Sequence, residues 1–279
     1  MWRWLDRLRN RERRPRQLIP DLLWQGTLDR CPFLLNLGAA ELARLRELAS
    51  LFLEEKEFHG AHGLLITDAM AVTIAAQACL PVLHLGPGTQ PLRWYDDFVG
   101  IVVHPDEVLA RREVVDEAGI VHEYDEPLAG EAMPGGPVTL SWRDVTASSS
   151  ETGYNVVIHE FVHKLDLRDG VADGCPPLAP GFLGHPSART ARAHWQATLQ
   201  ADYEAFREAV IKAERFGAEP TWLDPYGAEA VDEFFAVASE AYFVNRERFA
   251  REFPTLLPLL DAFFRPARQD PPLSAGARL

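Results

Sequence analysis

One pentapeptide constrains this chain more than any other feature: residues 159–163 read His-Glu-Phe-Val-His, the pattern HExxH. On an α-helix, residues four apart lie one turn apart and about 40° around the axis, so the imidazoles of His159 and His163 project side by side. Two imidazoles at that separation can share one tetrahedral Zn²⁺ ion. Glu160 lies about 100° around the helix from His159, beside the metal, where it can take a proton from an activated water.

The residues around the motif favour a helix buried in the core. Apolar residues occupy positions 156–158, and Phe161, Val162 and Leu165 continue the pattern on the other faces. Placing two histidines and a carboxylate inside a core costs free energy unless they are paired or bound to a metal. The sequence therefore favours a metal site over two core histidines with a salt-bridged glutamate.

Composition is that of an ordinary globular protein. The 279 residues are 47 % apolar and 25 % charged, which argues against disorder of the whole chain. The net charge of −13 argues against a nucleic-acid partner, because phosphate binding needs an accumulated basic surface. The three cysteines are widely spaced, show no disulfide framework or CxxC pattern, and indicate a reducing compartment.

No segment predicts export or stable insertion into a membrane, so we expect a cytoplasmic protein. The N-terminus has basic residues but lacks the apolar stretch of a signal peptide. The longest apolar segment, residues 69–85, is shorter than a bilayer-spanning helix and is interrupted by Gln77 and Pro81. Residues 1–16 carry seven arginines and a local charge of +5, and we interpret residues 1–17 as a basic, flexible segment.

The order of the elements predicts an α+β fold in which helices and strands are segregated. Apolar residues recur at helical spacing in residues 39–55, and a second helix is expected to begin at Thr67 and end before Pro81. Short β-branched runs between residues 100 and 142 predict a small mixed sheet, with 139–142 as an edge strand for an extended peptide. Helical patterns then return around residues 195–210 and 234–242, and the proline-containing residues 266–279 are expected to be a disordered tail.

Two histidines do not complete a catalytic zinc site, which needs a third protein ligand. The extended pattern HExxHxxGxxH is absent, because Asp169 occupies the position of its last histidine. Acidic residues on a later helix are the alternative, and Glu229, Glu233 and Glu240 lie along one face of the predicted helix. Periodicity alone does not choose among the three.

Several segments together resemble the Mlc titration factor A family of bacterial zinc peptidases. The HEFVHKLD stretch that begins at His159 is followed, some 60 residues later, by Asp-Pro-Tyr and then by Glu-Phe-Phe-Ala-Val-Ala-Ser-Glu. The resemblance covers roughly residues 18–265, which we interpret as a single zincin-like peptidase domain with an N-terminal helical part. It also includes residues 79–86, 103–122 and 138–142.

The resemblance implies a gluzincin site, similar also to the catalytic domain of anthrax lethal factor, with one Zn²⁺ per chain. Those families place a tyrosine seven residues before the glutamate that binds the metal, a separation that Tyr226 and Glu233 have here. By this resemblance Glu233 is the third ligand, beside His159 and His163, and Tyr226 stabilises the oxyanion. Asp166 and Glu240 match positions that would orient the metal-bound imidazoles.

The resemblance also implies aminopeptidase-like hydrolysis of peptides. In enteric bacteria the family's namesake binds a glucose-responsive transcriptional repressor, which adds a repressor of sugar uptake as a second expected partner beside the peptide substrate. The alternative is a protein that mainly binds a regulator on a peptidase fold. The intact Glu160 speaks against that alternative, because a binding protein needs no base beside the metal.

Overall fold

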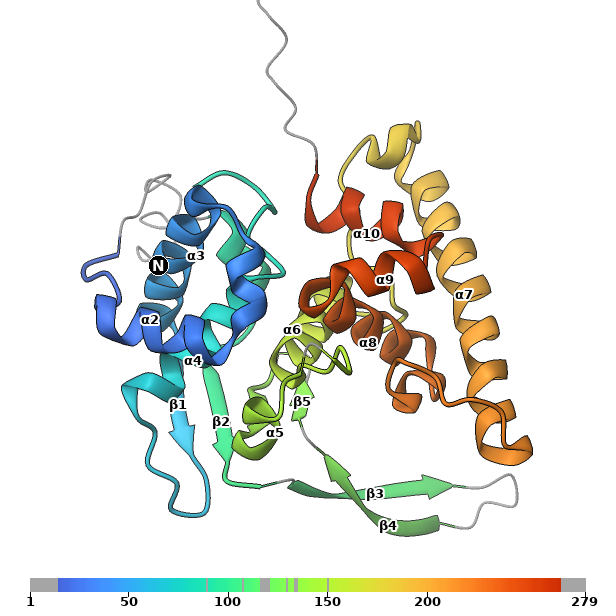
Figure 1. The fold of residues 1–279 in the computed structure, drawn as a ribbon, viewed down its shortest axis with the longest axis horizontal. Coiled ribbons are helices and arrows are strands. Elements are labelled where there is room, and N and C mark those ends of the chain that lie inside the picture. The colour runs from blue at the N-terminus through green and yellow to red at the C-terminus, as the bar shows by residue number, and fades with distance from the viewer. Residues whose placement is uncertain are drawn as a thin grey trace, which may run out of the picture.

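Helix α6 (Val156–Asp166) carries the HExxH motif and lies at the centre of the molecule, between an N-terminal group of helices with the sheet and a C-terminal group of helices (Figure 1). The fold is known from a computed structural model, which describes residues 15–266 apart from positions 89, 107, 116–120, 129, 133–134 and 150. The predicted N-terminal segment lies outside the described residues up to position 14, and the predicted tail lies outside them from position 267.

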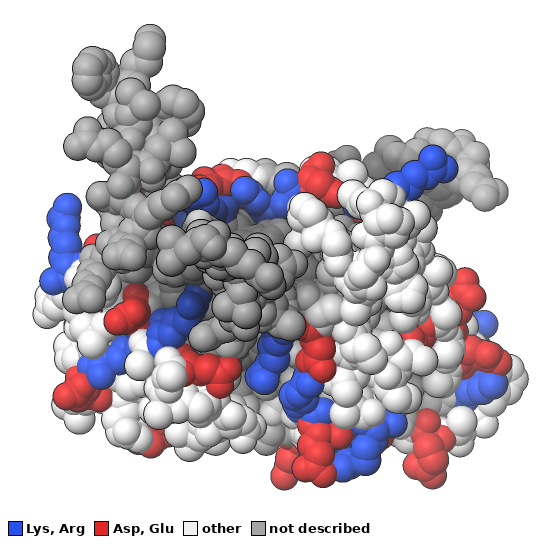
Figure 2. Space-filling model, turned by 90° about the horizontal axis from the view of Figure 1, so that it is seen from above, with Lys and Arg blue, Asp and Glu red and all other residues white. Residues whose placement is uncertain are grey.

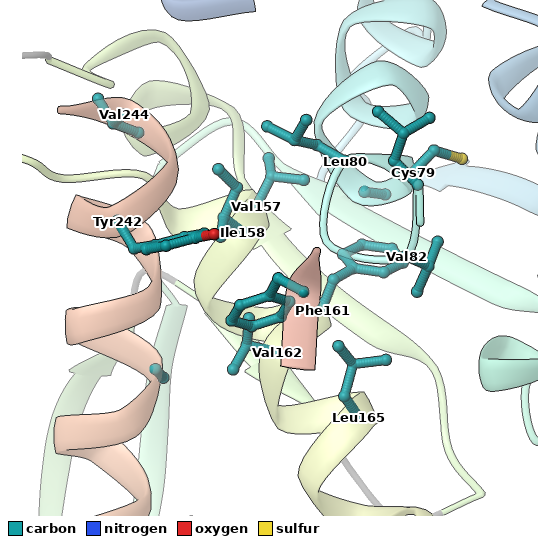
Figure 3. Packing of buried hydrophobic residues seen from close by; sticks show 14 of the residues in the cluster. Cys79, Leu80, Val82, Val157, Ile158, Phe161, Val162, Leu165, Tyr242 and Val244 are labelled. Atoms are coloured by element: carbon teal, nitrogen blue, oxygen red, sulfur yellow. The ribbon is translucent and has the colours of Figure 1, made fainter. Parts of the chain in front are cut away.

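Helix α6 is buried on nearly all of its faces, as its apolar sequence predicts. Phe161 is fully buried, and its ring centroid lies 5.7 Å from that of Phe52, 5.0 Å from that of Tyr95 and 6.0 Å from that of Phe98. Figure 3 shows Phe161 with Val157, Ile158, Val162 and Leu165 among the apolar residues that pack around the helix. The helix is therefore fixed rigidly by its neighbours, which is what a precisely spaced pair of histidines requires.

Three helices, α2 (Asp21–Arg30), α3 (Ala39–Glu55) and α4 (Asp68–Cys79), form the N-terminal group, and a short 3₁₀ segment, η1 (Pro32–Asn36), joins the first two. The helix predicted for residues 39–55 has these bounds in the structure. Helix α4 begins where predicted, since the Thr67 side chain accepts a hydrogen bond from the Met70 backbone N–H at 3.3 Å. It ends at Cys79, before Pro81.

The predicted small mixed sheet is present, with four strands in the order β1 (Glu57–Gly60), β2 (Gly100–His104), β6 (Val138–Ser141) and β5 (Gly130–Ala132). Strands β1, β2 and β6 pair in parallel, and β5 pairs antiparallel with β6. The prediction that residues 139–142 form an edge strand is wrong. Strand β6 is paired on both sides, Trp142 begins helix α5 (Trp142–Thr146), and β5 is the edge strand nearest α6.

The strands β3 (Val108–Val115) and β4 (Val121–Leu128) belong to a separate antiparallel ribbon and not to the main sheet. Their register runs from Val108 opposite Leu128 to Val115 opposite Val121, so each strand finds its hydrogen-bond partners in the neighbouring strand of the same hairpin. Figure 1 shows the ribbon extending along one side of the molecule, below the helices.

The C-terminal group of helices packs on the other side of α6. Helix α7 (Ala188–Phe216) forms the outer wall in Figure 1, and helix α8 (Val231–Val244) lies between it and α6. The fully buried Trp195 of α7 contacts Phe235 of α8 and Phe263, with ring centroids 5.6 Å and 5.7 Å apart. The group is completed by η3 (Leu167–Asp169), η4 (Phe182–Gly184), η5 (Pro225–Ala228), α9 (Arg246–Glu252) and α10 (Leu256–Phe264), while η2 (Gln90–Tyr95) precedes strand β2.

Both ends of α6 are tied to other elements by buried polar side chains. Asn155 caps the helix by accepting a hydrogen bond from the Ile158 backbone N–H at 2.9 Å, and its amide group donates to Gln77 of α4 at 2.7 Å. Near the other end, the buried Lys164 ammonium group donates to Asp97 at 2.7 Å. These contacts fix the axial position of the helix as well as its orientation.

Charged side chains of both signs lie on the surface. On the face shown in Figure 2, acidic and basic side chains are interspersed over the described part of the surface. Among the described residues, no helix combines the length and apolar character that crossing a bilayer requires.

The position of Asn155 predicts a stability effect. Replacing Asn155 with Ala removes the cap of α6 and leaves the buried Gln77 oxygen without its donor, so we expect a loss of about 2–4 kcal/mol in the free energy of unfolding. Denaturant unfolding measures this loss. Ser187→Ala, which removes the exposed cap of α7, is the matched control and should cost about 1 kcal/mol or less. Equal effects of the two substitutions would contradict the buried role of Asn155.

Candidate metal centre

Three side chains from two helices converge on one point. His159 and His163 project from α6, and Glu233 projects from the first turn of α8. The His159 Nε2 and His163 Nε2 atoms lie 3.1 Å apart, and Glu233 Oε2 lies 3.1 Å from the first and 3.2 Å from the second. In the described part of the chain, these residues form the one group of His, Cys, Asp and Glu side chains close enough to hold an ion.

The spacing and chemistry of these three atoms suit a metal ion. Ligand atoms at about 2.0–2.1 Å from a tetrahedral ion are about 3.3 Å from one another, close to the three separations observed. Two imidazole nitrogens and one carboxylate oxygen are also a donor set that a catalytic metal takes, with one position left for water. His159, His163 and Glu233 could therefore hold a divalent cation without a change in the backbone.

Glu240 fixes the orientation of His159. Its Oε1 atom accepts a hydrogen bond from His159 Nδ1 at 2.7 Å, and its Oε2 atom accepts one from the Asn155 backbone N–H. With its proton on Nδ1, a neutral imidazole presents the lone pair of Nε2 toward Glu233 and His163. The contact predicted between Glu240 and a histidine of the motif is thus present, and Asn155 supports it from the start of the same helix.

The cluster brings carboxyl groups and imidazoles together in a buried setting. Burial works against a charged His159, yet its hydrogen bonds to Glu233 and Glu240 raise its pKa well above the ordinary value. Burial alone would raise the pKa of Glu233, but hydrogen bonds to the two histidines hold that pKa well below its usual range. Carboxylates buried against imidazoles favour a bound positive charge, because an uncompensated buried charge is costly.

Glu160 lies beside this cluster and is 4 % exposed. Burial raises the pKa of its carboxyl group to about 7, although the positive charges of His159 and His163 oppose the rise. A carboxyl group that titrates near neutral pH can accept a proton and return it, which is the property of a general base and acid. It follows His159 directly on the rigid helix α6, so its distance from the cluster is fixed by the fold.

Tyr226 also reaches the site. Its ring centroid lies 6.1 Å from that of His159, and it belongs to η5, which directly precedes α8. Gly227 allows this placement, because a side chain there would come within 3.3 Å of Val237 and 3.4 Å of Phe206. The close packing of η5 on α8 therefore positions Tyr226 and Glu233 as one unit.

Two of the other acidic residues named from the sequence lie elsewhere. The prediction that Glu229 shares a helix face with Glu233 is wrong, because Glu229 is exposed and precedes α8. Asp166 accepts a hydrogen bond from the Gly174 backbone N–H at 2.8 Å and so holds the chain that follows α6. Among the described residues, the Asp166 carboxylate makes no hydrogen bond to an imidazole of the motif, so its predicted role in orienting one is not seen.

Sequence reasoning missed the supports of the site, Asn155 and Gln77. An Asn directly before an apolar helical run is a typical N-cap signal, and it could have identified Asn155. A glutamine within the apolar residues of α4 is a further signal, because a buried amide must find partners. Neither signal shows that the two side chains meet, since they lie 78 residues apart in the chain.

The α+β fold, the HExxH helix and the glutamate brought to it from a second helix define the zincin-like class of metallopeptidases. Comparison with known families agrees, since residues 4–265 match the family described as "Glucose-regulated metallo-peptidase M90". The chain belongs to this family. The match begins at residue 4, so it includes most of the basic segment that we expected to lie outside the resemblance.

Individual relatives are similar over most of the chain. The chain is 36 % identical over 241 residues to "Mlc titration factor A" of Edwardsiella ictaluri, covering 86 % of this chain and 85 % of the relative. It is 34 % identical over 251 residues to the protein of the same name from Salmonella arizonae, covering 90 % and 92 %. The corresponding protein of Klebsiella pneumoniae is 32 % identical, with coverage of 90 % and 87 %.

The geometry predicts three different effects on metal affinity. We expect Glu233→Ala to weaken binding more than any other change on α8, because it removes one of three converging atoms. Glu240→Ala should weaken binding by about 10- to 100-fold, because His159 loses the partner that orients it. Glu229→Ala is the control and should leave affinity unchanged.

Calorimetric titration of the metal-free variants with a divalent ion such as Zn²⁺ measures all three affinities. Wild-type affinity in Glu233→Ala would mean that another residue completes the site.

Proposed function

We propose that this protein is a zinc-dependent peptidase of the gluzincin type with one zinc ion per chain, held by His159, His163 and Glu233. The observation that carries the proposal is the triangle of donor atoms, 3.1–3.2 Å on each side, directly beside the buried carboxyl group of Glu160. A binding site alone would need the triangle but not an acid–base group next to it.

The side chains around the site have separate roles in the reaction. A zinc ion held there would lower the pKa of a water molecule and polarise the substrate carbonyl. Glu160 takes the proton of the attacking water and delivers it to the leaving amine. Tyr226 donates a hydrogen bond to the oxygen on which negative charge develops. Glu240 keeps the His159 ring in place while the charge at the site changes.

The edge strand β5 offers a place for an extended peptide. It is paired on one side by β6, and it contacts α6. A peptide could add its backbone to the other side of β5, because main-chain hydrogen bonds at a free strand edge are a common way to bind extended chains. This role passes from residues 139–142, where the sequence analysis had placed it, to residues 130–132.

The aminopeptidase-like preference rests on the family resemblance, and a peptide panel tests it. Each peptide would be offered with a free and with an acetylated N-terminus, together with amide and ester substrates that contain no peptide bond. Faster cleavage of the free form supports an aminopeptidase, and equal cleavage of both forms contradicts it. Cleavage of the non-peptide substrates alone would indicate a metal hydrolase of another kind.

The names of the relatives suggest a second candidate function. They are called titration factors of Mlc, and we propose that this chain also binds a transcriptional repressor of sugar uptake. Binding of purified Mlc-type repressor to wild type and to Glu160→Gln separates the two functions. Binding that survives in Glu160→Gln supports a regulator-binding role independent of catalysis. Wild-type protein that binds the repressor but cleaves no peptide would favour the regulator as its main function.

Substitution of the proposed base gives a sharp prediction. Glu160→Gln should keep one zinc per chain but lose most hydrolysis, by about 10²–10⁴-fold in kcat, because the amide cannot take the proton. Elemental analysis and peptide release are the two measurements, and Glu229→Gln is the control for removing an acidic side chain outside the cluster. Loss of zinc together with activity would assign Glu160 a structural or ligand role.

Removal of the Tyr226 hydroxyl tests the oxyanion role. Tyr226→Phe keeps the ring near His159, so the zinc content should not change. We expect kcat to fall by about 10²–10³-fold, the usual cost of one lost oxyanion donor. Steady-state kinetics with the same peptide measures the change, and wild-type kcat would exclude the hydroxyl from the reaction.

A further inference from the structure

Strand β5 packs against the helix that carries the motif, and at Gly130 its backbone lies against Glu160. A Cβ atom placed on Gly130 would lie 2.6 Å from Glu160 Cγ and 2.7 Å from Glu160 Cδ, and closer still to Oε1. Non-bonded carbon atoms are normally about 3.5–4.0 Å apart. No side chain can therefore occupy position 130 while the carboxyl group of Glu160 stays where it is.

The carboxyl group is the part of this contact that can move. Gly130 pairs with Leu140 of β6, which is fully buried, so a shift of the strand would disturb the pairing within the core. The backbone of Glu160 is held in α6, whose neighbour Phe161 is also fully buried. An added methyl group at position 130 would thus displace the Glu160 side chain and leave the helix and the sheet in place.

The other strand glycines of the sheet provide a comparison. A Cβ atom on Gly60, at the end of β1, would also clash, but with the Leu64 backbone and not with a side chain of the site. Gly100 begins β2 in the same sheet, and a Cβ atom there would lie 3.5 Å from Pro137 Cβ, an ordinary van der Waals contact. Gly130 has no positive φ, so its backbone conformation does not require glycine. The requirement at position 130 is the space taken by Glu160.

We propose that Gly130 is a positioning residue: its backbone, which carries no side chain, packs against the Glu160 carboxyl group and holds it beside the cluster of His159, His163 and Glu233. The proposal rests on the function given above, in which Glu160 is the base. It also assigns β5 a part in the reaction, because the strand that offers an edge to an extended peptide is the strand that sets the position of the base.

Kinetics of Gly130→Ala test the proposal. We expect kcat to fall by about 10²-fold, since a displacement of about 1 Å in a reacting group can cost that much. KM and the zinc content should stay at the wild-type values, because neither the outer edge of β5 nor the three ligands change. Gly100→Ala is the matched control and should keep wild-type kcat. Wild-type kcat in Gly130→Ala, or loss of zinc together with activity, would overturn the proposal.

A second measurement does not depend on hydrolysis. Gly130→Ala should lower the melting temperature by several degrees when Glu160 is present, because the side chain is forced out of its place. In the Glu160→Ala background the obstructing atoms are gone, and the same substitution should have little effect. An equal decrease in both backgrounds would show that Gly130 does not act through Glu160.

The two measurements also separate this proposal from the proposed function. If wild type hydrolyses no peptide, the proposed function fails while the thermal comparison still reports on the contact. If wild type is an active peptidase and the two thermal shifts are equal, the function stands and the role of Gly130 is refuted.

Discussion

The rest of the site depends on one interaction, in which two carboxylates contact opposite nitrogens of a single imidazole. Glu233 and Glu240 are seven residues apart on α8, about two turns, so both face α6 with a separation of about 10 Å along the axis. The His159 ring fills the space between them, with Nε2 at 3.1 Å from Glu233 and Nδ1 at 2.7 Å from Glu240. The ring of His159 thereby sets the distance and the rotation of α8 relative to α6. His163, one turn further along α6, then reaches Glu233 without any further adjustment of the two helices.

The sequence predicted the parts of the site that lie within one helix. HExxH fixes the relation of His159, Glu160 and His163 because helix geometry is the same everywhere. Periodicity could not choose the third ligand among the three acidic residues, because it treated Glu229 as part of the helix, whereas α8 begins at Val231. The choice of Glu233 came from the separation between Tyr226 and Glu233 and from the family resemblance, and the structure brings that residue to the two histidines.

The sheet was predicted less well, for physical reasons. The β-branched runs identified β2 and β6, but β1 and β5 have only four and three residues and no alternating pattern. Strand order depends on which backbones meet in space, and β6 became internal because β5, eight residues earlier in the chain, turns back to pair with it. The contact between Gly130 and Glu160 depends on that pairing, so no local signal in the sequence could reveal it.

The placement of β5 also bears on whether the protein cleaves or only binds. A site that served only to capture a regulator could hold a metal with the three ligand atoms and would have no use for a carboxyl group buried beside them. Burying Glu160 costs free energy, because it moves an ionisable group away from water. Here the strand backbone lies so close to that carboxyl group that a Cβ atom on Gly130 would overlap it. An arrangement that confines the proposed base next to the candidate metal ligands, and places beside both a strand that is paired on one side only among the described residues, suits a reaction on an extended peptide better than capture alone.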